Sequence, residues 1–93
     1  PLNADIHVTL RQIDLDRVVA EIGRIPFVLR ADSLAGDDDL SCRVAARDHG
    51  HLEEITSMIL AIDGVERLRT DIVLRRRIPH RILPLLRDLR DHV

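Results

Sequence analysis

Four segments of the chain have the pattern of β-strands. In residues 5–10 polar and apolar residues alternate, so that Ile6, Val8 and Leu10 would point into a core. Residues 65–75 alternate in the same way, while residues 27–34 and 40–46 are rich in β-forming residues and lie close enough along the chain to pair as a hairpin. The pattern therefore predicts four strands.

Two further segments carry apolar residues at the spacing of a helix. After Asp14, a suitable N-cap, these residues recur until Pro26, which cannot continue a helix. After Asp48 they recur until Gly64, the residue type that favours a left-handed C-terminal cap. The apolar positions are Leu15, Val18, Val19, Ile22 and Ile25 in the first segment, and Leu52, Ile55, Ile59 and Ile62 in the second.

The six elements follow one another as βαββαβ, which is the split βαβ arrangement. This order predicts a ferredoxin-like α+β fold, a two-layer sandwich in which two helices cover one face of a four-stranded antiparallel sheet. In the last strand the two faces would carry Leu68, Thr70, Ile72 and Leu74 on one side, and Arg67, Arg69, Asp71, Val73 and Arg75 on the other. The face without helices must either be polar or be buried against a partner.

The length of 93 residues predicts a single domain, with the βαββαβ core over about residues 4–76. A domain of this size leaves much of its surface exposed unless copies associate, so we expect a homo-oligomer. Over residues 78–93 apolar residues recur at helical spacing, and Pro84 would stand in the first turn of an extra C-terminal helix. We expect this helix to pack on the sheet edge or on another subunit.

Composition narrows the class of protein. All fourteen basic residues are Arg and the formal net charge is −2, so the domain lacks the positive charge of one that binds nucleic acid by itself. Phe27 is the only aromatic residue, which argues against base stacking. No apolar run approaches the roughly 20 residues of a membrane span, and no signal peptide opens the sequence. We expect a cytoplasmic protein without membrane contact.

The loop from Ala35 to Leu40 is the strongest candidate for a site. Gly36 would supply the positive φ of a tight turn, and the three acids Asp37, Asp38 and Asp39 repel one another unless something screens them. Three interpretations remain open: a solvated turn, a site for the ammonium of an amino acid, and a site for a hard cation such as Mg²⁺. The cation is the least favoured, because consecutive side chains of an extended loop point in alternating directions. Asp39 is the first candidate for the ammonium.

The sequence offers no convincing catalytic or metal site. Cys42 is the only cysteine, which excludes a disulfide within the chain, and it would be an inert core thiol. His49 and His51 have no third ligand nearby, so we expect them to be exposed at a helix start. His7 lies on a polar strand face with no evident partner. We therefore expect no metal, no cofactor and no enzymatic activity.

Several short motifs occur in a known order: Ile25-Pro26-Phe27-Val28, the loop from Gly36 to Asp39, Arg43-Val44-Ala45-Ala46-Arg47-Asp48, Leu52, Asp63-Gly64-Val65 and Thr70-Asp71-Ile72-Val73-Leu74. In these motifs the chain resembles the C-terminal regulatory domain, or RAM domain, of the Lrp/AsnC (feast/famine) transcription regulators. The resemblance implies a domain that dimerises through its sheet, assembles into tetramers or octamers, and binds an amino acid or related small effector between dimers.

The resemblance also implies where the effector binds. The loop from Gly36 to Asp39 would form one wall of the site, and Thr70 and Asp71 on the last strand would form a second. Thr70 is equally well explained as a β-branched strand former. Asp38 stands where the family often has an aromatic residue. The family's helix-turn-helix domain would precede residue 1, so we expect DNA contact only through an upstream domain.

Two other functions remain open. One is a stand-alone interaction module of the same fold that caps or mixes with full-length regulators. The other is a small dimeric enzyme of the ferredoxin-like α/β-barrel group, which would need a polar cavity between sheet and helices and a base such as His7. The aliphatic helix faces argue against the enzyme.

Overall fold

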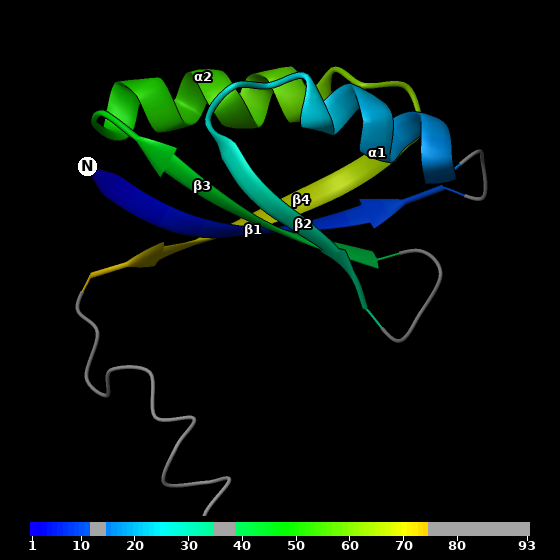
Figure 1. Cartoon of the computed structure of the whole chain (residues 1–93), viewed down its shortest axis with the longest axis horizontal. Coiled ribbons are helices and arrows are strands. Elements are labelled where there is room, and N and C mark those ends of the chain that lie inside the picture. Colours follow the sequence, from blue (N-terminus) through cyan, green and yellow to red (C-terminus); the bar gives the residue numbers. More distant parts are fainter. Residues whose placement is uncertain (12–14, 35–38, 75–93) are drawn as a thin grey trace, which may run out of the picture.

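The computed structural model describes residues 1–11, 15–34 and 39–74. Both helices lie on one side of a single sheet, and among the described residues no helix covers the other side (Figure 1). The strand order is β2-β3-β1-β4, and each neighbouring pair is antiparallel. The elements are β1 (Leu2–Leu10), α1 (Leu15–Gly23), β2 (Val28–Ser33), β3 (Asp39–Ala46), α2 (His49–Leu60) and β4 (Val65–Val73). This arrangement confirms the predicted ferredoxin-like α+β fold.

The predicted element boundaries differ from the observed ones by a few residues. β1 begins at Leu2 rather than Asp5, because the ladder with β3 continues to the pair Leu2↔Ala46. Asp48 caps α2 as predicted, since its carboxylate accepts a hydrogen bond from the backbone N–H of His51 at 2.8 Å. α2 ends at Leu60 with Ala61 as its C-cap in the right-handed helical region, so the prediction that Gly64 caps this helix is wrong. Gly64 lies directly before β4 and has a φ of 108°, which favours glycine there. Asp14 and the predicted helix over residues 78–93 lie outside the described residues.

The side of the sheet under the helices, which we name the covered face, holds the core. Burial alternates with period two along β1, as predicted from the sequence, and it alternates in the same way along β3. Ile6 from β1, Ile22 from α1 and Ile55 from α2 are all fully buried. Cys42 is also fully buried, and this desolvation, helped by the negative charge of Asp32, raises the pKa of its thiol to about 11. The core is aliphatic and its one thiol stays protonated at neutral pH.

The prediction that His51 is exposed is wrong. Its side chain is only 4 % exposed, its Nδ1 accepts a hydrogen bond from the backbone N–H of Arg47 at 2.9 Å, and the ring of Phe27 packs edge-on against it at 4.2 Å. The cap at Asp48 sets the first turn of α2 so that His51, and not the exposed His49, faces inward. Within the described ranges no group of three or more His, Cys, Asp or Glu side chains could hold a metal ion.

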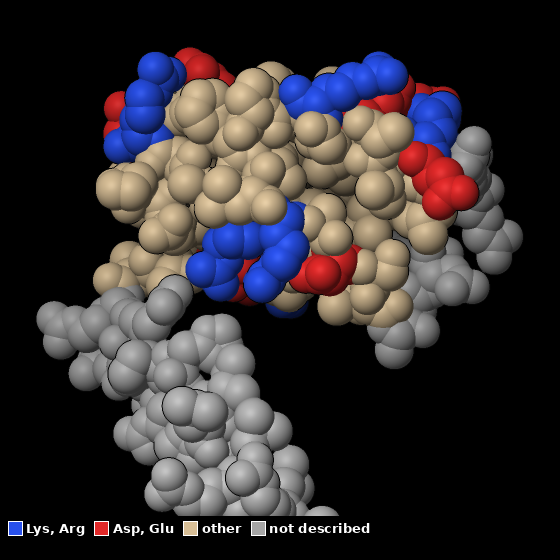
Figure 2. Space-filling model, in the orientation of Figure 1, with Lys and Arg blue, Asp and Glu red and all other residues tan. Residues whose placement is uncertain are grey.

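Charged side chains lie along two margins of the molecule. Seen from the side, charged atoms lie at the two ends of the helix layer and again under the middle of the sheet, with uncharged atoms between these groups (Figure 2). None of the helices in the described part of the chain is long and apolar enough to cross a membrane. The charged margin under the sheet belongs to the face that the helices leave bare.

Candidate functional site

The bare side of the sheet, which we name the open face, is strongly polar. Because side chains alternate between the two faces of a strand, every second residue points away from the helices. These residues are Asn3, Asp5, His7 and Thr9 of β1, Arg30 and Asp32 of β2, Asp39, Ser41, Arg43 and Ala45 of β3, and Arg67, Arg69, Asp71 and Val73 of β4. Arginines and aspartates dominate the set, so the face without helices is polar, which is one of the two alternatives that the sequence left for it.

Most of these charges are paired on the open face itself. Arg43 binds Asp5 with two hydrogen bonds, Nε to Oδ1 at 2.6 Å and Nη2 to Oδ2 at 3.1 Å, and both side chains are about 30 % exposed. Arg30 pairs with Asp32 at 3.1 Å near the sheet edge. The first ion pair joins the adjacent strands β3 and β1, and the second lies within β2.

Asp71 receives a second set of contacts. His7 approaches it with Nε2 at 3.4 Å from Oδ2, and Arg69 approaches the same oxygen at 3.5 Å. The expectation that His7 has no partner is therefore wrong, because the register with β4 brings the two strands' polar side chains together. The sequence could not show this contact, since the two residues are far apart in the chain.

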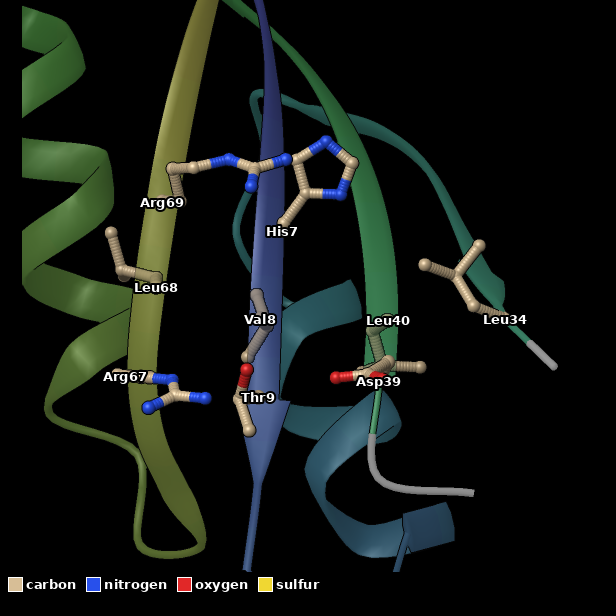
Figure 3. Close-up of a pocket in the computed structure, with 9 residues that line it drawn as sticks. All are labelled: His7, Val8, Thr9, Leu34, Asp39, Leu40, Arg67, Leu68 and Arg69. Carbon is tan, nitrogen blue, oxygen red and sulfur yellow. The ribbon is translucent and has the colours of Figure 1, made fainter. Parts of the chain in front are cut away.

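A pocket of about 370 Å³ opens near one end of the open face. It lies where β1 ends, β3 begins and β4 has just begun (Figure 3). This volume is in the range of small-molecule sites. The pocket is lined by His7, Val8, Thr9, Leu34, Asp39, Leu40, Arg67, Leu68 and Arg69.

Two opposite charges face each other across this pocket. Thr9 pairs with Asp39 on one side and with Arg67 on the other, so the three residues form one row across β3, β1 and β4. In Figure 3 the Asp39 carboxylate and the Arg67 guanidinium both extend toward Thr9. Asp39 is half-buried, and within the described residues neither charge takes part in a salt bridge. The row therefore presents an anion and a cation to the same space.

The other predicted site residues are not brought to this pocket. Gly36, Asp37 and Asp38 lie outside the described residues. Asp71 is on the open face, two rows away from Asp39, and pairs with His7. Asp39 is thus the one predicted residue that the described structure places in the pocket.

Thr70 lies on the opposite face of the sheet. It pairs with Ile6, whose side chain is buried under the helices, so Thr70 points toward α2. There it lines a second cavity of about 230 Å³, together with His49, Leu52, Glu53, Thr56 and Ile72. One protomer alone therefore does not bring Thr70 and Asp39 into a common site.

Sequence reasoning missed Arg67 and Thr9 as pocket residues. The alternation in residues 65–75 placed Arg67 on the polar face, which was the available signal. What the pattern lacked was the register that sets Arg67 opposite Thr9 and, one strand further, Asp39. Register between distant strands is not encoded in the spacing of residues along one strand.

The fold and the open face define a ferredoxin-like α+β domain with a ligand-sized polar pocket. Residues 3–83 match the family profile described as the Lrp/AsnC ligand binding domain, and the chain belongs to this family. Its function is therefore considered below in comparison with regulators of this family. A comparison with curated protein sequences gave no match.

Solved structures of the same fold support this assignment. A protein from Thermus thermophilus is 26 % identical with a TM-score of 0.76, and the match covers 85 % of this chain and 100 % of that one. A Neisseria meningitidis transcriptional regulator in complex with L-Met is 25 % identical with a TM-score of 0.76, covering 90 % and 56 %. A feast or famine regulatory protein from M. tuberculosis, complexed with L-methionine, is 26 % identical with a TM-score of 0.71, covering 86 % and 54 %. This chain thus spans just over half the length of the two regulators.

Proposed function

We propose that this chain is the effector-sensing and oligomerisation domain of an Lrp/AsnC-type transcriptional regulator. It binds an amino acid or a related small molecule between dimers, and the bound effector shifts the assembly state because it has different affinities for the alternative assemblies. Control of DNA binding then passes through a helix-turn-helix domain that is not among these 93 residues. The domain carries out no catalysis and works in the cytoplasm.

The pocket that contains Asp39 is the observation that carries this proposal. The half-buried carboxylate of Asp39 forms no salt bridge within the described residues and can therefore accept hydrogen bonds from an ammonium group. Two relatives in the same fold were solved with L-methionine, which has such an ammonium. Both facts favour an amino acid as the effector.

The separation of Asp39 from Thr70 supports a site built from more than one protomer. Asp39 lies on the open face at one end of the sheet, while Thr70 lies beside α2 on the covered face. If both contact one effector, they must come from different copies of the chain. Such a composite site couples effector binding to assembly directly, because the effector stabilises the contact that completes its own site.

A stand-alone module of the same fold is the second candidate function. The Thermus thermophilus protein is covered over its full length by this match, so a chain that consists of this domain alone exists among its structural relatives. Such a module would cap or mix with full-length regulators. Reading the coding sequence upstream of residue 1 decides between the two, since a helix-turn-helix segment there would contradict the stand-alone module.

Isothermal titration against the twenty common L-amino acids tests the proposal. We expect at least one of them to bind, and we expect Asp39→Ala to weaken that binding at least about tenfold by removing the carboxylate that faces the ammonium. Asp32→Ala is the matched control, because Asp32 is an open-face acid that does not line the pocket and is already paired with Arg30. Silence across all twenty amino acids would refute a common amino acid as the effector.

Sedimentation velocity with and without the tightest binder tests the second half of the proposal. We expect the distribution of dimers and larger assemblies to change when the amino acid is added, and Asp39→Ala to need a higher concentration for the same change. An amino acid that binds without altering the distribution would contradict control through assembly.

A further inference from the structure

We infer that residues 78–93 dock into the groove between α2 and β4 of the same chain. The groove is the cavity of about 230 Å³ on the covered side of the sheet. Its lining residues are His49, Leu52, Glu53 and Thr56 of α2, together with Thr70 and Ile72 of β4. The inference goes beyond the proposed function and does not depend on it, because docking needs no effector.

The residues of β4 that face the helices are less buried than their partners on β1. β4 is an edge strand, and its covered-face residues Leu68, Thr70 and Ile72 are only half-buried. The residues of β1 that pair with these three are at most 1 % exposed. Within the described part of the chain, the helix layer therefore leaves the β4 edge of the core incompletely covered.

The side of α2 that borders the groove also has exposed apolar surface. Leu60 lies one helical turn after Thr56, so it extends the row of groove residues along α2, and it is 51 % exposed. Leu68 and Ile72 supply apolar side chains on the opposite wall. A further helix with one apolar side could bury its apolar residues between these two walls.

Residues 78–93 have the sequence pattern of such a helix. Leu85, Leu86 and Leu89 recur at helical spacing, and we name them the leucine row. The match to the family profile ends at residue 83, so the leucine row lies beyond the part of the chain that matches the family. These leucines need a surface on which they can be buried, and the groove offers one.

The groove is within reach of residues 78–93 of the same chain. Ile72 lines it, and only residues 73–77 separate Ile72 from this segment. α2 begins on the side of the molecule where β4 ends (Figure 1). The half-buried row from Ile72 to Leu68 is about 13 Å long, and a helix from Ile82 to Leu89 would be about 10 Å long. A short connection favours docking in the same chain over docking on a second copy, because it raises the effective concentration of the segment.

Charge complementarity supports the same occupant. α2 contains Glu53 and Glu54 but neither Lys nor Arg. Glu53, at the groove, takes part in no salt bridge within the described residues. Residues 75–93 contain six Arg and two Asp, and Arg90 stands next to the leucine row. An arginine at the border of the row could therefore pair with Glu53 at the rim of the groove.

Chemical cross-linking in the full chain tests the inference. Leu86→Cys is combined with Thr56→Cys in one variant and with Ser57→Cys in another, and a short bismaleimide joins two thiols that lie close together. Thr56 lines the groove, whereas its neighbour Ser57 does not. We expect cross-linking within one chain to be at least about threefold faster with Thr56→Cys, because adjacent residues of a helix point in different directions.

The reactivity of the thiols does not favour the expected result. Ser57 is exposed and Thr56 is half-buried, so a difference in access alone would make Ser57→Cys the faster variant. The native Cys42 should not react at neutral pH, because it is fully buried and its thiol stays protonated. Circular dichroism of each variant checks that the fold is kept.

Two further substitutions test whether the leucine row holds the segment in the groove. Leu89→Gln, added to the Thr56→Cys and Leu86→Cys variant, should slow cross-linking at least about threefold, because it removes an apolar side chain that docking would bury. Arg87→Gln is the matched control. It changes a residue that does not face the same side of the helix as the leucine row, so it should leave the rate unchanged.

The mass of the product identifies the surface on which the segment docks. A cross-linked product with the mass of one chain supports docking in the same chain. A main product with the mass of two chains would show docking on a second copy and would overturn the inference. Equal rates for Thr56→Cys and Ser57→Cys, or an unchanged rate in Leu89→Gln, would overturn it as well. The proposed function is tested separately, because none of these measurements involves an amino acid.

Discussion

The two faces of the sheet differ in burial and in polarity. On β1 the side chain of Ile6 is completely buried, while that of its neighbour His7 is 35 % exposed and contacts Asp71. The covered face is mainly aliphatic, whereas on the open face arginines and aspartates dominate and, among the described residues, are paired except at one end. The difference shows that one strand can build the core with its even-numbered residues while its odd-numbered residues present polar groups on the open face.

The largest effect should come from the covered face. Ile6→Ala removes a fully buried side chain at the centre of the sheet and should lower the free energy of unfolding by about 2–5 kcal/mol. Urea unfolding followed by circular dichroism at one protein concentration measures it, because the chain has no Trp or Tyr to report by fluorescence. His7→Ala is the matched control on the next residue, with an expected loss below about 1 kcal/mol. Equal losses would remove the distinction between the faces.

A smaller effect should appear at alkaline pH, again from the covered face. Burial raises the pKa of Cys42 from 9.0 to about 11, so the unfolded chain releases this proton near pH 9 while the folded chain keeps it. Stability is therefore complete below pH 9 and should fall as the pH rises toward 11. The chain contains no Lys or Tyr, so no other side chain titrates in this range.

Urea unfolding at pH 8 and at pH 10.5 measures the alkaline loss. Cys42→Ala should be less stable than the unchanged protein at pH 8 because of the cavity, but it should lose little more between the two pH values. A Cys42→Ala variant with the same pH dependence as the unchanged protein would show that the thiol is not the cause.

The smallest effect should come from the open face. A double-mutant cycle with Asp5→Asn and Arg43→Gln should give a coupling of about 1 kcal/mol, at the upper end for such pairs because the contact has two hydrogen bonds and is only about 30 % exposed. The same cycle on Arg30 and Asp32, which are more exposed, should give a coupling near zero. A larger coupling for the exposed pair would show that burial does not set the strength of these contacts.

The sequence predicted the elements and their faces because both depend on local periodicity. In β1 the buried positions are the apolar ones that the alternation predicts, and Asp48 caps its helix as expected. His51 was wrongly assigned to the surface because polarity, and not the geometry of the capped turn, guided the expectation. Periodicity and capping preferences predict a structural feature when the residues that form it are close together in the chain.

The site was only partly predictable for the same reason. Asp39 is predictable as a site residue because it belongs to a run of three acids in the sequence. Arg67 lines the pocket only because β4 pairs with β1 in one particular register. A shift of that register by one residue would turn Arg67 under the helices and leave the pocket without its cation. Whether Gly36, Asp37, Asp38, Thr70 and Asp71 contact an effector stays a prediction that titration of their variants can test.

The strand order has a consequence for how the domain is made. β1 lies between β3 and β4, which begin only at Asp39 and Val65, so it leaves the ribosome with neither neighbour available. The backbone N–H and C=O groups of β1 cannot pair with a neighbouring strand until β3 has been synthesised. The four-stranded sheet is complete only when β4 has also been synthesised. Folding of the domain therefore waits for contacts between distant parts of the chain, and the strand that is translated first completes its pairing last.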